Sequence, residues 1–448
     1  MNDFERAAYP DTLRIPKAGD VVYVKFKDQP YREERLGEKL SGGGEGNVYA
    51  TEHYRSMVIK LYHPKNLTVG RVEKIAALAE EIADVNSEIF DYICWPKATV
   101  YDFEGGHMIG YLMEKVPDGA VPLETLIAQI ADDCNPLDYD RTDLVELCRR
   151  IAERFSLLHR LAEKRLLMCD VNPSNILIAP NTKQVYFVDL DSYQYDSNSG
   201  KRLRCPVGRR EYTSPELYER MREQQTHSYA EVDRTAVDEG FAVAVLYFTI
   251  LTLGCEPFEN YGESYEEVIR RGKFVFSGDH LPNAIWNNLS ERLQGMFKGI
   301  FMNRKTYGDS EWIDAFVMLQ ADLAEGKFCK ELRPHTYPLA PYDHIKEHTC
   351  NRCGERFTGS RLLYDKYPFC RDCMVQVNRE EKICHRVTCD RCGQIFVINE
   401  ADRKVISGKV VCPDCNPIAY VMRRSLFTDY ENVAEELTAM AMKKWEEN

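Results

Sequence analysis

Three polar side chains in the middle of the chain have types and spacings that suit phosphoryl transfer. Asp170 lies five residues before the amide residue Asn175, and Asp189 directly follows the apolar run 185–188. Asp170 can accept the proton of an attacking hydroxyl group, whereas Asn175 and Asp189 offer the hard oxygen ligands that magnesium prefers. The pattern predicts a site that holds magnesium on a nucleotide and transfers phosphate from ATP.

A glycine-rich segment and a lysine lie upstream of these residues. Residues 40–49 include four glycines, which let a backbone approach phosphate groups closely. Lys60 ends an apolar run in which an unpaired ammonium group is costly, so it needs an anionic partner unless it faces water on an edge strand. Nucleotide phosphate and a carboxylate on the following helix would both serve. We expect that carboxylate to be Glu73, with Glu80 and Glu81 as alternatives.

Taken together, these segments resemble the protein kinase superfamily over residues 35–320. The glycine-rich segment is similar to the family's Gly-x-Gly-x-x-Gly-x-Val loop. Ser41 stands at its first glycine, Gly43 and Gly46 at the other two, and Val48 at the valine. The resemblance implies ATP and magnesium as cofactors and, more narrowly, a bacterial Ser/Thr-kinase-like enzyme.

The resemblance also implies a role for each matching residue. Lys60 falls on the lysine that binds phosphate, and Glu73 on its helix carboxylate. Asp170 falls on the catalytic base, and Asn175 and Asp189 on the magnesium ligands. The adenine hinge is the segment 113–116, in which the backbones of Glu114 and Val116 would meet the base. Residues 208–216 are similar to the close of the activation segment, and 254–258 to the family's Gly-x-x-Pro-Phe.

Several further positions depart from the family pattern. Cys169 replaces the arginine that grips a phosphorylated activation segment, so we expect activity without such phosphorylation. Asn172 replaces a lysine that bridges phosphate and acceptor, and Arg209 replaces a threonine, so a small-molecule acceptor stays open beside a protein substrate. Asp191 replaces the glycine of Asp-Phe-Gly, and it is the alternative to Asp189 as the metal ligand.

The cysteines near the end of the chain form a repeat. Two Cys-x-x-Cys pairs lie 16 residues apart, and two more lie 19 residues apart. Each set suits one tetrahedral structural zinc ion, as in zinc ribbons. Cys384 and His385, between the sets, are a spare ligand pair or simply linker residues. The eight predicted zinc ligands are Cys350, Cys353, Cys370, Cys373, Cys389, Cys392, Cys412 and Cys415.

Composition places the chain among intracellular globular proteins. It has 448 residues, a formal net charge of −13 and no membrane-length apolar run, and its start lacks a signal-peptide core. We therefore expect a cytoplasmic protein. Residues 344–416 hold 13 Lys and Arg against 10 Asp and Glu, too small an excess to predict nucleic-acid binding, which stays uncertain.

We expect an α+β chain with a bilobal kinase-like fold, two small four-cysteine zinc ribbons and a C-terminal helix. The expected parts are an N-terminal extension (1–34), a small lobe (35–115), a large lobe (116–330), a linker (331–348), a first ribbon (349–376), a second ribbon (387–416) and a C-terminal helical segment (417–448).

The favoured hypothesis is an active protein kinase whose ribbons recruit a partner or regulate it. A catalytically silent nucleotide-binding scaffold is one alternative. A nucleic-acid reader, in which the kinase-like domain regulates the ribbons, is another. Kinases that resemble this chain also imply two partners, a metal-dependent phosphatase and a protein with a von Willebrand-type domain.

Overall fold

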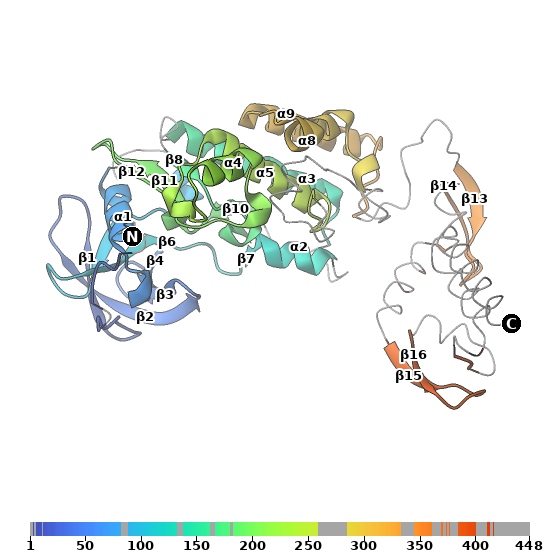
Figure 1. The fold of residues 1–448 in the computed structure, drawn as a ribbon, viewed down its shortest axis with the longest axis horizontal. Coiled ribbons are helices and arrows are strands. Elements are labelled where there is room, and N and C mark those ends of the chain that lie inside the picture. Colours follow the sequence, from blue (N-terminus) through green and yellow to red (C-terminus); the bar gives the residue numbers. More distant parts are fainter. Residues whose placement is uncertain are drawn as a thin grey trace. The chain divides into compact units, whose positions relative to one another are not determined.

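A computed structural model of the chain shows two compact units, Met1–Leu332 and Arg333–Asn448, which we describe separately (Figure 1). The structure describes the following residues: 3, 6–10, 12–81, 88–131, 138–161, 166–179, 182–258, 285–332, 345–360, 369–370, 373, 376, 384–399, 410–412 and 415.

The first unit begins with a closed β-barrel, blue in Figure 1, whose strands follow the order β1-β2-β3-β4-β6-β5 and pair antiparallel. Buried side chains alternate with half-buried ones along β1, the period of a strand with one face in the core. The strands are β1 (Val21–Lys25), β2 (Arg32–Gly42), β3 (Gly46–Thr51), β4 (Met57–Tyr62), β5 (Ala98–Tyr101) and β6 (Met108–Glu114).

The barrel includes a strand that the sequence assigned to an N-terminal extension. β1 pairs with β2 on one side and with β5 on the other, so it is the strand that closes the barrel. The predicted boundary at residue 35 falls inside β2. The extension is therefore part of the small lobe, because without β1 the edges of β2 and β5 would lack partners.

One helix, α1 (Val69–Glu81), packs against β5 and β6 of the barrel and against the turn Leu190–Ser192. Its buried face contains the apolar residues Ile75 and Leu78, but also two cations, Arg71 and Lys74. Apolar side chains fix the helix on the barrel, and the cations need anions on the opposing surface.

The large lobe is mostly helical (Figure 1). Its centre is α5, which is apolar on nearly every side, as expected of a helix enclosed by others. The described helices are α2 (Leu123–Ala131), α3 (Arg141–Leu161), α4 (Pro215–Glu223), α5 (Ala236–Leu251), α8 (Glu291–Asn303) and α9 (Asp309–Ala324).

Two small three-stranded sheets carry the loops of the site. One has the order β10-β9-β7 and the other β12-β11-β8. The site residues follow β8 and β10, so both sheets hold them in place. The strands are β7 (Val121–Pro122), β8 (Leu166–Met168), β9 (Ile176–Ala179), β10 (Gln184–Phe187), β11 (Tyr193–Asp196) and β12 (Arg202–Leu203).

The second unit contains two antiparallel hairpins, β13 (Ile345–Thr349) with β14 (Arg356–Ser360) and β15 (Cys384–Thr388) with β16 (Ile395–Asn399). Cys384 and His385, which the sequence left as linker or ligands, begin β15. The predicted C-terminal helical segment lies outside the described residues, as does most of the predicted linker. No described helix is both long and apolar enough to cross a membrane.

Candidate active site

The loop after β8 presents Asp170, and asparagine side chains fix its shape. Asn172 donates from Nδ2 to the Asp170 carbonyl (3.0 Å) and accepts from the Ser174 amide (3.0 Å), so it caps the short turn Pro173–Asn175. Asn175 Nδ2 donates to the Asp170 carboxylate (3.0 Å) and to its carbonyl (2.9 Å). The carboxylate of Asp170 is thus oriented before any substrate arrives.

Lys60 lies in the cleft on β4 and meets carboxylates from distant parts of the chain. Its ammonium nitrogen contacts Asp189 Oδ1, lies 3.0 Å from Asp191 Oδ1, and lies 3.5 Å from Glu45 Oε2. The Lys60 side chain is only 11% exposed, so the alternative of an edge lysine facing water does not hold. The requirement for an anionic partner was predicted correctly.

The predicted partner, Glu73, lies elsewhere. Its carboxylate is 40% exposed and 2.5 Å from Lys201 Nζ. The reason is the helical period, because position 73 lies about 200° around α1 from the buried Arg71. Among the described residues, the acids that contact Lys60 come from the glycine-rich segment and from the turn after β10.

Helix α1 contributes cations to this cleft. Arg71 lies 2.7 Å from Glu45 Oε1 and, through Nε, 3.2 Å from Asp191 Oδ2. Lys74 donates to the backbone carbonyl of Asp191 (2.8 Å). Three acids and three cations therefore share one buried cluster.

The cluster shifts the pKa values of its members. Burial alone would lower the pKa of Lys60, but Asp191 and Asp189 raise it well above its usual value. Burial favours a neutral Asp191, yet Lys60 and Arg71 hold its pKa well below the usual range. Burial, followed by the charge of Asp191, raises the pKa of Asp189 to about 7. Burial lowers the pKa of Lys74 to about 8.

Asp189 has a backbone conformation that is uncommon outside glycine. Its φ is 65° and its ψ is 51°, in the left-handed region, which aspartate adopts more readily than most residues and which occurs often at functional sites. The Val188 amide donates to the Asn175 carbonyl (3.0 Å), so Asn175 and Asp189 lie on adjoining segments. The structure thereby brings both predicted magnesium ligands to one edge of the cleft.

The donor set fits a hard divalent cation. Carboxylate oxygens of Glu45, Asp189 and Asp191 all lie within 4.8 Å of one another. Magnesium prefers carboxylate oxygens together with substrate phosphate. Asp189 and the amide oxygen of Asn175 would hold the ion, which would neutralise charge on a bound triphosphate.

The glycine-rich segment connects β2 to β3. A Cβ on Gly46 would lie 2.2 Å from the Leu61 carbonyl oxygen, so glycine is needed there for β3 to approach β4. Gly43 donates to the Gly46 carbonyl (3.0 Å), and no atom lies within 4 Å of the place where its Cβ would be. Val48 follows on β3 as a half-buried side chain.

The predicted hinge follows the barrel. Glu114 is the last residue of β6, opposite Met57 of β4. The backbone amide of Lys115 donates to the Ser56 carbonyl (2.9 Å), and Val116 packs against the barrel core. The segment therefore leaves the barrel at the point where the chain passes to the large lobe.

Cys169 contacts the activation segment directly. It lies in a small buried cluster with Leu167 and Cys205. The guanidinium group of Arg234 donates to the carbonyls of Cys169 (3.2 Å) and Val207 (3.0 Å). Buried packing and backbone hydrogen bonds hold this segment against the catalytic loop, at the position where the family uses an arginine and a phosphate.

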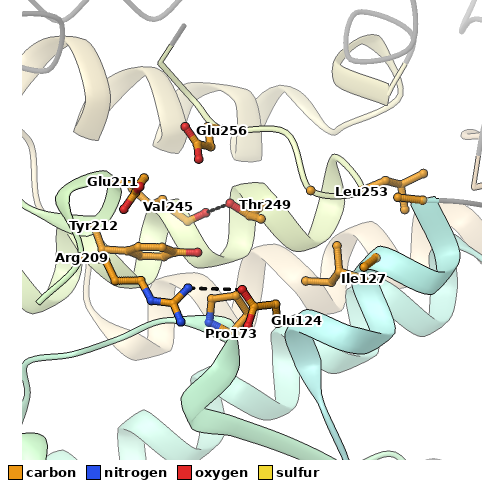
Figure 2. Close-up of a pocket in the computed structure, with 13 residues that line it drawn as sticks. Glu124, Ile127, Pro173, Arg209, Glu211, Tyr212, Val245, Thr249, Leu253 and Glu256 are labelled. Atoms are coloured by element: carbon orange, nitrogen blue, oxygen red, sulfur yellow. Dashed lines mark hydrogen bonds and ion pairs between the residues drawn. The ribbon is translucent and has the colours of Figure 1, made fainter. Parts of the chain in front are cut away.

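A pocket of about 470 Å³ opens beside the catalytic loop, between α2 and α5 (Figure 2). Arg209 reaches across it, 3.3 Å from Glu124 and 2.5 Å from the Ser174 hydroxyl. Glu211 and Glu256 line the same pocket from the activation segment and the end of α5. Arg209, which departs from the family pattern, therefore lines this pocket.

In the second unit, the predicted cysteines come together in two clusters of four. Their sulfur atoms lie within 4.8 Å of one another in each cluster. Cys353 and Cys370 are 3.6 Å apart, as are Cys392 and Cys412. Four thiolates at 2.3 Å from zinc would lie about 3.8 Å apart, so both clusters fit a tetrahedral ion.

The two clusters share the same local turn. Gly354 and Gly393 have φ values of 75° and 74°, which favour glycine. Each donates to the carbonyl of the first cysteine of its pair, Cys350 or Cys389, at 2.9 Å. The repeat read from the sequence is therefore a repeat in structure.

No family model matches the chain. Two relatives named Protein kinase YegI, from Escherichia coli strains K12 and O157:H7, are each 28% identical, over 324 and 323 residues. The alignments cover 68% and 67% of this chain. They cover 47% of each relative, so the chain spans about half the length of the curated relatives that it matches.

Solved structures with a similar fold include a rhoptry kinase from Toxoplasma gondii, with a TM-score of 0.49 and 12% identity over 69% of this chain and 85% of that one. Rad53 in complex with AMP-PNP has a TM-score of 0.42 and 17% identity, over 63% of this chain and 64% of that one.

The barrel followed by a helical lobe, the order of the motifs and the sequence similarity make the first unit similar to protein kinases. The two four-cysteine clusters near the C-terminus fit zinc ribbons that follow the kinase fold.

Sequence reasoning missed the roles of Glu45, Arg71 and Lys74. A signal for the helix cations was present, because positions 71, 74, 75 and 78 form one helical face that mixes two cations with two apolar residues. A buried face of that composition predicts acids on the opposing surface. Glu45 carried no comparable signal, since a polar residue is ordinary in a glycine-rich turn.

Proposed function

We propose that the chain is an ATP- and magnesium-dependent protein kinase that transfers the γ-phosphate to a Ser or Thr hydroxyl group. The observation that carries the proposal is the contact of Lys60 with Asp189, residues 129 positions apart in the chain. In this contact Lys60, the residue predicted to bind phosphate, meets Asp189, the residue predicted to bind magnesium. The amide of Val188, the residue before Asp189, donates to the Asn175 carbonyl. The Asn175 side chain donates in turn to the Asp170 carboxylate.

Each residue has a distinct task in this proposal. Lys60 binds and orients the phosphates, and Asp189 and Asn175 hold magnesium on them. Gly43, Gly46 and the backbone around Glu114 and Val116 position the nucleotide, as the family resemblance implies. Asp170 accepts or orients the proton of the acceptor hydroxyl. Rate enhancement would come from positioning and from neutralisation of charge.

The pocket in Figure 2 supports an acceptor site of unusual composition. Arg209 pairs with Glu124 there, beside the catalytic loop. We propose that the acceptor approaches Asp170 from this side of the loop, where Pro173 lines the pocket. We propose a protein acceptor, with the ribbons recruiting or regulating it in a cytoplasmic setting. A metal-dependent phosphatase and a von Willebrand-type protein are proposed partners.

The experiment is incubation of the full chain with labelled ATP and magnesium, followed by mass spectrometry for phosphate on this chain and on added proteins. We expect incorporation that requires magnesium. Binding of ATP without any transfer would show a silent nucleotide-binding scaffold instead. A matched assay measures nucleic-acid binding across a range of salt concentrations, and salt-dependent binding would favour a nucleic-acid reader.

A further inference from the structure

The side chain of Asp191 is the most enclosed acid in the nucleotide cleft. It is 1% exposed, against 26% for Asp189 and 35% for Glu45. Its Oδ1 lies 3.0 Å from Lys60 Nζ. Asp191 therefore supplies a buried carboxylate to a lysine whose partner the sequence placed on α1.

The same aspartate also contacts α1. Its Oδ2 lies at ion-pair distance, 3.2 Å, from Arg71 Nε, and its backbone carbonyl accepts from Lys74 Nζ at 2.8 Å. Asp191 thus connects strand β4 to helix α1, because it contacts Lys60 on the strand and Arg71 and Lys74 on the helix. Helix α1 therefore contributes cations to this connection, whereas the predicted lysine–glutamate pair had an acid on the helix.

We propose that Asp191 is the positioning residue for Lys60, and that it docks α1 onto the cleft through Arg71. This proposal rests on the proposed function, because it concerns the lysine that orients the nucleotide. Asp191 reaches the phosphates only through Lys60. Asp189 also contacts Lys60 but is more exposed, so it can serve magnesium while Asp191 keeps Lys60 in place.

The contacts of Asp191 argue against its use as a direct metal ligand. Both of its carboxylate oxygens face cations of this chain, Lys60 and Arg71. A metal ion would have to displace one of these buried contacts. Asp189 is more exposed and lies on the left-handed turn at the edge of the cleft, so it is the better ligand.

The test uses the full chain and a fluorescent ATP analogue, mant-ATP, with magnesium. Asp191→Asn should weaken mant-ATP binding about tenfold, the loss expected for one charge-assisted contact. The KM for ATP should rise by a similar factor, while the KM for a protein acceptor stays within twofold. Asp314→Asn, a matched change at an exposed site on α9, should alter neither quantity.

Glu73→Gln tests the other candidate partner on the same helix. We expect mant-ATP affinity within twofold of wild type, because Glu73 pairs with Lys201 at the surface. A large loss in Glu73→Gln together with no loss in Asp191→Asn would overturn the proposal. It would show that α1 supplies the carboxylate after all.

Asp191→Asn leaves buried cations with one fewer acid, so it could lower stability. The double variant Asp191→Asn with Arg71→Gln removes one charge of each sign and should recover most of the thermal midpoint. Its mant-ATP affinity should remain about tenfold weaker than that of wild type, because Lys60 still lacks the buried carboxylate of Asp191. Recovery of wild-type affinity in the double variant would overturn the proposal, since Asp191 would then act only on folding.

The outcome is separable from that of the proposed function. If the wild type binds mant-ATP but transfers no phosphate, the kinase proposal fails and the positioning role of Asp191 is still measured by binding. If the wild type transfers phosphate and Asp191→Asn retains wild-type affinity and KM for ATP, the positioning proposal fails alone.

Discussion

The nucleotide cleft and the cysteine clusters both gather ligand atoms at one point, but they balance charge in different ways. In the cleft, Lys60, Arg71 and Lys74 face three acids, so the cluster is balanced by the chain itself. Each cysteine cluster offers four thiols, and among the residues that the structure describes the first adjoins a small apolar group around Phe369. The cleft can therefore form without an added ion, whereas the ribbons depend on one.

Their surroundings differ in the same sense. The first unit has large apolar cores in both lobes, which fix the backbone independently of the site. The described part of the second unit contains two hairpins and few buried apolar residues. Segments this short need a metal ion in place of a core. Removal of magnesium should thus affect the function of the first unit, whereas removal of zinc should affect the folding of the second.

The largest expected effect follows zinc removal. Structural zinc contributes roughly 10 kcal/mol or more to the folding of such modules. Cys353→Ser, or a strong chelator, should unfold the first ribbon, detected as rapid proteolysis of the second unit. Binding of mant-ATP by the first unit should be unchanged.

The matched control is Cys329→Ser, a free cysteine in the first unit that should leave both readouts intact. Loss of mant-ATP binding on chelation of zinc would contradict this contrast between the units, because it would show that the cleft depends on the ribbons.

The next largest effect is on the rate of phosphoryl transfer, with folding unchanged. Asp170→Asn should lower the rate of phosphoryl transfer by about 10²- to 10⁴-fold, the range for loss of a general base. Nucleotide affinity should stay within about threefold, because the contacts of Lys60 and Asp189 are untouched. Rates from labelled ATP and affinities from mant-ATP measure the two quantities, and an undiminished rate would reject Asp170 as the base.

The two units should respond to pH in opposite directions. In the first, His159 lies between Glu239 (2.6 Å) and Asp309 (2.7 Å). Burial lowers its pKa, but these hydrogen bonds outweigh burial and raise the pKa to about 10. A raised pKa stabilises the fold fully below the unfolded value of about 6.5, and the contribution is lost as pH rises to about 10.

The measurement is the thermal midpoint of the first unit between about pH 6 and pH 10, the window set by these two pKa values. His159→Gln should be less stable at pH 6 and should show a flatter alkaline decline. The second unit should instead lose zinc in acid, because protons compete for its thiolates. An alkaline decline as steep in His159→Gln as in wild type would show that this histidine is not the cause.

The smallest expected effect concerns the activation segment. Cys169, Cys205 and Arg234 hold it through buried contacts. Phosphatase treatment, or Ser199→Ala at its exposed turn, should change the rate by less than about twofold, since no phosphate is needed for docking. A loss of activity restored by rephosphorylation would contradict this prediction.

The sequence predicted most where local chemistry decides the structure. The zinc turns follow from Cys-x-x-Cys-Gly, and Asn172 and Asn175 shape the catalytic loop within six residues. It predicted less where distant segments meet. The need of Lys60 for an acid was evident, but the sequence offered only Glu73, Glu80 and Glu81 on the following helix as candidates. The rotation of α1 turns Glu73 away from Lys60. β1 was misassigned for the same reason, because its partner β5 lies some 75 positions away.

The central claim is that the cleft around Lys60 transfers phosphate from ATP. The most direct measurement is the amount of phosphate on the full chain after incubation with ATP and magnesium, compared among wild type, Lys60→Met and Asp170→Asn. The account predicts phosphate on wild type, and at least about 10²-fold less on both variants at equal folding. Equal incorporation in all three, or none in a wild type that binds ATP, would contradict it.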